Sequence, residues 1–221
     1  MNLPLIITNF KATESSIGDN ALKMAKIHQE VAQEKNVNII IAVQTADLKE
    51  VTKNTDIPVY AQHIDGVSYG SHTGKFPAQF AKDLGAKGTI LNHSENRFND
   101  FEELKKAINE AKKVGLEVVC CAESVEEGEK ISKETKADLI AIEPPELIGG
   151  DISVSTAQPE LIEESVSKIG TQKVLVGAGI KNTQDVKIAL KLGAQGILVA
   201  SGITKSQAPK SSLEDLAKPM V

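Results

Sequence analysis

The chain contains eight short apolar runs, and most of them are separated by stretches with helical spacing. The runs are nearly continuous and do not alternate with polar residues, which is typical of strands that are covered on both faces. They span residues 3–8, 37–43, 57–61, 88–92, 116–122, 137–142, 173–178 and 196–200. The pattern therefore predicts a parallel sheet built from repeated strand–helix units.

Helix signals fill most of the intervals between these runs. Apolar residues from Ala21 to Ala32 share one face at helical spacing. Further helices are predicted over residues 101–114, 125–133 and 160–169, and from Asn182, which is a good N-cap residue. Several helices precede a glycine, the residue that most often follows a helix. These glycines are Gly85, Gly115, Gly170 and Gly193.

The two halves of the chain contain similar segments. Leu84-Gly85-Ala86-Lys87-Gly88 resembles Leu192-Gly193-Ala194-Gln195-Gly196, about half a chain length away. Strands four and eight would lie there, which favours a closed parallel (β/α)8 barrel in a single domain, residues 1–221, with some shortened helices. Any helix–glycine–strand unit gives a similar segment, so an open doubly wound sheet is the alternative. The G-x-G-x-x-G fingerprint of nucleotide-binding sheets is missing after the first strand.

Composition argues against several classes of partner and predicts the type of core. The net charge is -5, so neither nucleic acid nor an anionic membrane is an expected partner. The absence of a membrane-spanning apolar stretch and of a signal-peptide layout indicates a cytoplasmic protein. Cys120 and Cys121 would point to opposite faces of one strand, so free thiols in a reducing compartment are expected. Aromatic residues are only 3% of the chain, which predicts an aliphatic core.

Residues suited to chemistry stand at the carboxyl ends of the predicted strands, where a barrel carries its active site. Small residues after the seventh and eighth strands would expose backbone N–H groups to an anion, with Lys11 as the countercharge. The candidate residues at this end are Asn9, Lys11, His93, Glu95, Glu143, Gly177, Ala178, Gly179, Ala200 and Ser201.

Glu143 ends an apolar run and is followed by Pro144 and Pro145. The prolines exclude both a helix and a continued central strand, and a segment with an apolar tip and two glycines comes next. This is the layout of a catalytic base beneath a lid. Taken alone, the stretch fits an exposed acid in a strand-to-helix turn equally well.

The remaining histidines have structural interpretations. His28 lies on an apolar helix face and is expected to be structural, whereas His63 and His72 are expected in turns or contacts. No His/Cys cluster has metal-ligand spacing, so no metal site is predicted.

The motifs together resemble the triosephosphate isomerase family, and in particular its short archaeal form. They occur in the family's order and cover essentially the whole chain. The matching segments are Asn9-Phe10-Lys11, His93-Ser94-Glu95-Asn96-Arg97, Glu143-Pro144 with Ile148-Gly149, Gly177-Ala178-Gly179 and Ala200-Ser201. The resemblance implies a TIM barrel that interconverts dihydroxyacetone phosphate and D-glyceraldehyde 3-phosphate without a metal or organic cofactor.

The resemblance also implies a role for each residue. Glu143 would be the base, His93 and Lys11 would stabilise an enediolate, and Asn9 and Glu95 would assist them. The phosphate would be held by Lys11 and by the backbone of a lid at Ile148 and Gly149, together with the loops after strands seven and eight. Two departures from the family pattern, Gly179 in place of a serine and Asp151 in place of a glycine, affect phosphate contacts.

The resemblance further implies self-association. Residues 67–75 look like the family's protruding interface loop, with Thr73 reaching a neighbour's site. The short form is typically a homotetramer and the longer form a homodimer, and the sequence does not choose between them.

Two other functions fit a phosphate-binding barrel. A Schiff-base aldolase would need a lysine inside the barrel, but the sixth strand ends in Glu143 and Lys11 follows the first strand. A metal-dependent epimerase would need more His and Asp at the rim. A catalytically silent barrel that binds sugar phosphates is opposed only by the joint presence of Lys11, His93 and Glu143.

Overall fold

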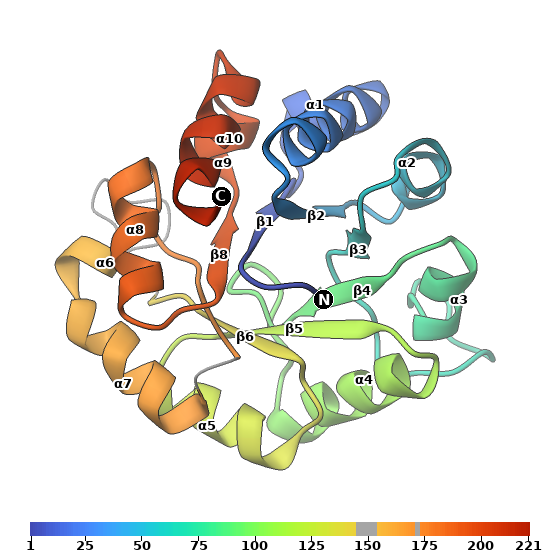
Figure 1. Cartoon of the computed structure of the whole chain (residues 1–221). Coiled ribbons are helices and arrows are strands. Elements are labelled where there is room, and N and C mark those ends of the chain that lie inside the picture. The colour runs from blue at the N-terminus through green and yellow to red at the C-terminus, as the bar shows by residue number, and fades with distance from the viewer. Residues whose placement is uncertain (145–153, 171–172) are drawn as a thin grey trace.

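Eight parallel strands close into a barrel in the computed structural model, in the order β1 to β8, with β1 pairing with β8 (Figure 1). The structure describes residues 1–144, 154–170 and 173–221. The strands are β1 Leu5–Asn9, β2 Asn38–Val43, β3 Val59–Ala61, β4 Gly88–Leu91, β5 Glu117–Ala122, β6 Leu139–Ile142, β7 Val174–Val176 and β8 Gly196–Val199. Each strand overlaps one of the predicted apolar runs, and only β1 extends past its run, by one residue to Asn9. The predicted closed (β/α)8 barrel is confirmed.

Helices surround the barrel on its outer side (Figure 1). They are α1 Asp19–Lys35, α2 Leu48–Asn54, α3 Ala78–Asp83, α4 Phe101–Lys113, α5 Val125–Glu134, α6 Val154–Ala157, α7 Pro159–Ile169, α8 Thr183–Lys191, α9 Ser201–Thr204 and α10 Pro209–Ala217, with short 3-10 helices η1 Glu14–Ser16 and η3 Lys218–Met220. Helices α2 and α3 have only 7 and 6 residues, as the prediction of shortened helices requires. No helix in the described ranges is long and apolar enough to cross a membrane.

The buried apolar residues form two clusters because neighbouring residues of a strand face opposite sides. Leu5 and Ile7 belong to the cluster inside the barrel, whereas Ile6 packs between the strands and the helices. The interior is aliphatic apart from Tyr60 and Cys121. The Tyr60 hydroxyl donates to Glu117 Oε2 at 2.6 Å. Gly88 makes room for this ring, because a Cβ there would lie 2.5 Å from Tyr60 Cζ.

Helix ends follow the predicted chemistry. The side chain of Asn182 accepts hydrogen bonds from two backbone N–H groups at the start of α8. Gly85, Gly115 and Gly193 follow their helices with positive φ angles between 74° and 99°, which a residue without Cβ adopts readily. His28 is completely buried in α1, and its Nδ1 lies 2.8 Å from the Met24 carbonyl oxygen, as expected of a structural histidine.

Candidate active site

A pocket opens at the carboxyl ends of the strands, where the sequence predicts the site. Most of the predicted residues line it, in company with residues that the sequence did not indicate. The pocket is lined by Asn9, Lys11, His93, Glu143, Gly177, Gly179, Ile180, Lys181, Leu198, Val199, Ala200, Ser201 and Gly202.

Glu143 follows β6, and its backbone N–H donates to the Ala122 carbonyl oxygen at the end of β5 at 2.9 Å. The residue is only 4% exposed, so the alternative of a solvent-exposed acid in a turn is wrong. Burial raises the pKa of Glu143 to about 7, although the Cys121 thiol and the Lys11 ammonium both stabilise its charged form. Its Oε2 has no hydrogen-bond partner in the part of the chain that the structure describes. A buried carboxylate with a free oxygen is suited to accept a proton from a substrate.

Gly177, at the end of β7, makes room for the Glu143 side chain. A Cβ at residue 177 would lie 2.5 Å from Glu143 Cγ and 2.9 Å from Glu143 Oε1. Sequence reasoning assigned Gly177 to an anion-binding loop, and its contact with the carboxylate adds a packing reason for glycine at this position.

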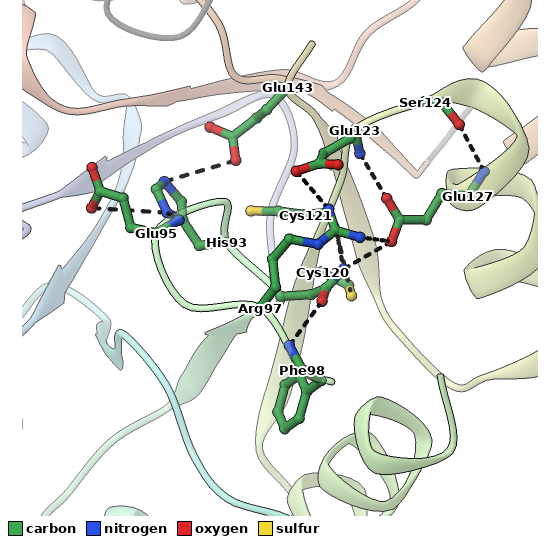
Figure 2. Close-up of polar contacts among 11 residues, drawn as sticks. His93, Glu95, Arg97, Phe98, Cys120, Cys121, Glu123, Ser124, Glu127 and Glu143 are labelled. Carbon is green, nitrogen blue, oxygen red and sulfur yellow. Dashed lines mark hydrogen bonds and ion pairs between the residues drawn. The ribbon is translucent and has the colours of Figure 1, made fainter. Parts of the chain in front are cut away.

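His93 faces Glu143 across the pocket, with 3.9 Å between His93 Nε2 and Glu143 Oε2 (Figure 2). The backbone N–H of Glu95 donates to His93 Nδ1 at 3.1 Å. In the neutral ring Nδ1 is therefore the acceptor nitrogen, and Nε2 carries the hydrogen that points toward the pocket. Burial, aided by the positive charge of Lys11, lowers the pKa of His93, which favours this neutral form.

Lys11 follows β1 in a left-handed backbone conformation with a φ of 52°. Its N–H donates to Asn9 Oδ1 at 3.0 Å, and its carbonyl oxygen accepts from the side-chain amides of Gln44 and Gln62 at 3.2 and 3.1 Å. The ammonium is paired with Glu95 Oε1 at 2.6 Å. Asn9 and two glutamines thus fix the backbone that presents this cation.

Some residues of the predicted phosphate-binding loops line the pocket and others do not. Gly179, Ala200 and Ser201 line the pocket, and Gly179 has a left-handed φ of 68° that favours glycine. Ala178 is completely buried and is not among the lining residues in the described part of the chain. Ile148 and Gly149 of the predicted lid, together with Asp151, lie outside the described residues.

Two residues at or beside the pocket, Cys121 and Lys181, were not indicated by the sequence. Sequence reasoning assigned no role to the Cys121 thiol, yet it faces the inside of the barrel and favours the charged form of the Glu143 carboxylate, which opposes the rise in the pKa of Glu143. Cys121 lies two residues after Val119 on β5, so the alternation of side chains along a strand places both on the same inward face, and this spacing was the available signal. Lys181 lines the pocket beyond β7 but was not singled out. Within the described ranges, no group of three or more His, Cys, Asp or Glu residues is placed to hold a metal ion.

Comparison with known proteins identifies the family. The family model of triosephosphate isomerase matches residues 4–218. The triosephosphate isomerase of Methanocaldococcus jannaschii is 43% identical over 190 residues, which cover 84% of this chain and 86% of that protein. The enzyme of the same name from Methanothermus fervidus is 41% identical over 224 residues, across 100% of both chains. The match spans both halves of the barrel and every strand end that contributes to the pocket, and the chain therefore belongs to the triosephosphate isomerase family.

Proposed function

We propose that Glu143 is the base and that the reaction passes through an enediolate when this member of the triosephosphate isomerase family interconverts dihydroxyacetone phosphate and D-glyceraldehyde 3-phosphate. The observation that supports this role most directly is the burial of Glu143 opposite His93, which raises the pKa of the carboxyl to about 7. Glu143 takes a proton from the carbon beside the substrate carbonyl and returns it to the neighbouring carbon. A base with a pKa near neutrality is both ionised often enough and basic enough for this transfer.

His93 acts as a neutral acid in this proposal. Its Nε2–H points toward the pocket because Nδ1 accepts the hydrogen bond from the Glu95 N–H. A neutral imidazole is a weak acid that donates a hydrogen bond to the substrate carbonyl and a stronger one to the developing enediolate oxygen. The positive charge of Lys11 favours the neutral ring and stabilises the same oxyanion.

The phosphate group would occupy the side of the pocket formed by the loops after β7 and β8. Gly179, Ala200 and Ser201 bring backbone there with little side-chain bulk. Lys11 supplies the countercharge, while Ala178 supports the loop from its buried position. We assign Ile148 and Gly149 to the same phosphate site on the strength of the family motif.

We further propose self-association as a homotetramer, with a homodimer as the alternative. Residues 68–75 are all exposed, and Tyr69 at the base of this segment is 60% exposed. An exposed segment with an aromatic residue and Thr73 near its tip fits a contact with a second copy. Light scattering that reports a stable and fully active monomer would contradict both assemblies.

A coupled assay in both directions tests the activity, and Glu143→Gln tests the base. The amide is close in size but cannot accept the proton, so kcat should fall by about 10²- to 10⁴-fold with little change in KM. Glu164→Gln is the control, because Glu164 is half-exposed on α7 in an ion pair with Lys168. Near-parental kcat in Glu143→Gln would overturn the assigned role. A parental protein that binds triose phosphates without turnover would favour the silent barrel.

A further inference from the structure

Asn92 connects β4 to the loop that carries His93 and Glu95, and its backbone is left-handed with a φ of 59°. This conformation is uncommon for a residue with a side chain, although asparagine tolerates it better than most. Among the non-glycine residues that the structure describes, only Lys11 and Asn36 also have a positive φ. The chain thus takes an unusual backbone turn at the residue that immediately precedes His93.

The Asn92 side chain is buried, with 3% of the residue exposed, and its amide contacts three different segments. Nδ2 donates to the Cys121 carbonyl oxygen at the end of β5 and to Glu127 Oε1 in the first turn of α5, both at 3.1 Å. Oδ1 lies 3.4 Å from the backbone N of Phe98, which donates to it. Two acceptors meet the amide nitrogen and one donor meets the amide oxygen, so only this orientation of the amide satisfies all three groups.

The hydrogen bonds of Asn92 reach the surroundings of both His93 and Glu143, the two residues at the proposed reaction centre. The loop that starts at Asn92 returns to the Asn92 side chain at Phe98, with His93 inside the closed turn. On the other side, the amide holds the carbonyl of Cys121, and Cys121 is the residue whose thiol favours the charged form of Glu143. Asn92 is therefore a direct link between the backbone of His93 and the residue that contacts the Glu143 carboxylate.

Glu127 is fixed by several donors in addition to Asn92. Arg97 Nη2 lies 2.6 Å from Glu127 Oε1, and the backbone N–H of Glu123 donates to Glu127 Oε2 at 2.8 Å (Figure 2). Arg97 Nη1 pairs with Glu123 Oε1 at 2.9 Å, and Ser124 Oγ accepts from the Glu127 N–H at 3.2 Å. The amide of Asn92 therefore donates to a carboxylate whose position is already set by the start of α5.

We propose that Asn92 is a positioning residue, whose side-chain amide holds the ends of β4 and β5 and the start of α5 so that His93 and Glu143 face each other. The proposal rests on the roles assigned above to His93 and Glu143. It predicts that the loss of the amide disturbs the geometry of the reaction centre more than the stability of the barrel. The phosphate loops after β7 and β8 make none of the hydrogen bonds that Asn92 forms, so substrate binding should change little.

The test compares Asn92→Gly with Asn36→Gly. Both substitutions allow a left-handed backbone, but Asn36 is exposed at the end of α1. We expect Asn92→Gly to lower kcat about ten- to a hundredfold with KM little changed, because small displacements of reacting groups have effects of this size. Asn36→Gly should keep parental kinetics. Circular dichroism establishes that each variant is folded at the assay temperature.

Nitrogen NMR of His93 separates a positioning role from a structural one. In the parental protein Nδ1 should have the shift of an unprotonated acceptor, and in Asn92→Gly this signal should move or broaden. Parental kcat in folded Asn92→Gly, or a rise in KM alone, would overturn the proposal. If Asn92→Gly does not fold, Asn92→Asp, which also tolerates this backbone but lacks both N–H donors, takes its place under the same criteria. Failure of both to fold would also overturn it, because the proposal assigns Asn92 to the site and not to the barrel's stability. If Asn92→Gly is impaired while Glu143→Gln is fully active, the proposed function fails instead.

Discussion

Glu143→Gln should stabilise the folded protein at neutral and alkaline pH. The carboxylate is buried, and burial is the largest cause of its raised pKa. In the unfolded chain the same group is in water and ionises with a pKa of about 4.5. The folded protein therefore holds a charge that would be more stable in solvent, and a neutral amide removes this cost.

The size of the effect follows from the pKa difference. A folded pKa of about 7 against 4.5 is about 2.5 units, which corresponds to about 3 kcal/mol at 1.36 kcal/mol per unit. Because the folded pKa is the higher one, the folded state keeps its proton longer as pH rises. The free energy of unfolding of the parental protein therefore falls by this amount as pH rises from 4.5 to 7, and the fall is complete above the folded pKa. The variant has no such loss.

Urea unfolding of both proteins at a series of pH values and one protein concentration measures the difference. The free energy of unfolding of Glu143→Gln minus that of the parental protein should rise by about 3 kcal/mol from pH 4.5 to pH 8. Contributions from other titrating groups are common to both proteins and cancel. Glu164→Gln, at an exposed position, should show no comparable rise. A difference that stays flat across this range would refute the argument that burial sets the pKa of Glu143.

Three further predictions concern the buried side chains of His28, His93 and Glu143. His28, with a pKa lowered to about 4 by burial, should contribute a fall of about 1.4 kcal/mol per pH unit in the free energy of unfolding as pH drops from 6.5 toward 4, and the difference between the parental protein and His28→Leu in urea titrations should show this fall. His93 should remain uncharged at pH values above 6.5 because burial lowers its pKa, and an imidazolium signal there in NMR titration would contradict this. Gly177→Ala should lower kcat in steady-state assays, since a Cβ would lie 2.5 Å from Glu143 Cγ, and parental kcat would show that the carboxylate does not need this space.

The strands of the fold could be predicted because strands that are buried on both faces appear in the sequence as short apolar runs. Strands covered on both faces are nearly continuously apolar, and each observed strand lies inside such a run except at Asn9, the last residue of β1. The presence of Tyr60 inside a mainly aliphatic barrel was not predictable, since it depends on Gly88 of the adjacent strand β4 and on Glu117 at the start of β5. These are contacts between strands, and a one-dimensional pattern does not contain them.

The convergence of the principal candidate residues could also be predicted, because the carboxyl ends of parallel strands meet at one rim. Asn9, His93 and Glu143 come together there as expected. The contacts that tune them could not be read in the same way. The left-handed backbone of Asn92 is a dihedral angle, and the thiol contact of Cys121 with Glu143 depends on the pairing of β5 with β6.

If Lys11 binds the substrate as proposed, its ion pair with Glu95 must break on binding. Lys11 Nζ lies 2.6 Å from Glu95 Oε1, but the Glu95 side chain is 58% exposed. An ion pair with such exposure contributes only about 0–1 kcal/mol, because water solvates both charges when it breaks. Glu95 therefore holds the Lys11 ammonium at the mouth of the pocket without opposing its transfer to an anionic substrate. A fully buried acid in the same place would bind Lys11 more tightly and would oppose that exchange. Glu143, by contrast, is buried, and its raised pKa is the property that the proposed proton abstraction requires.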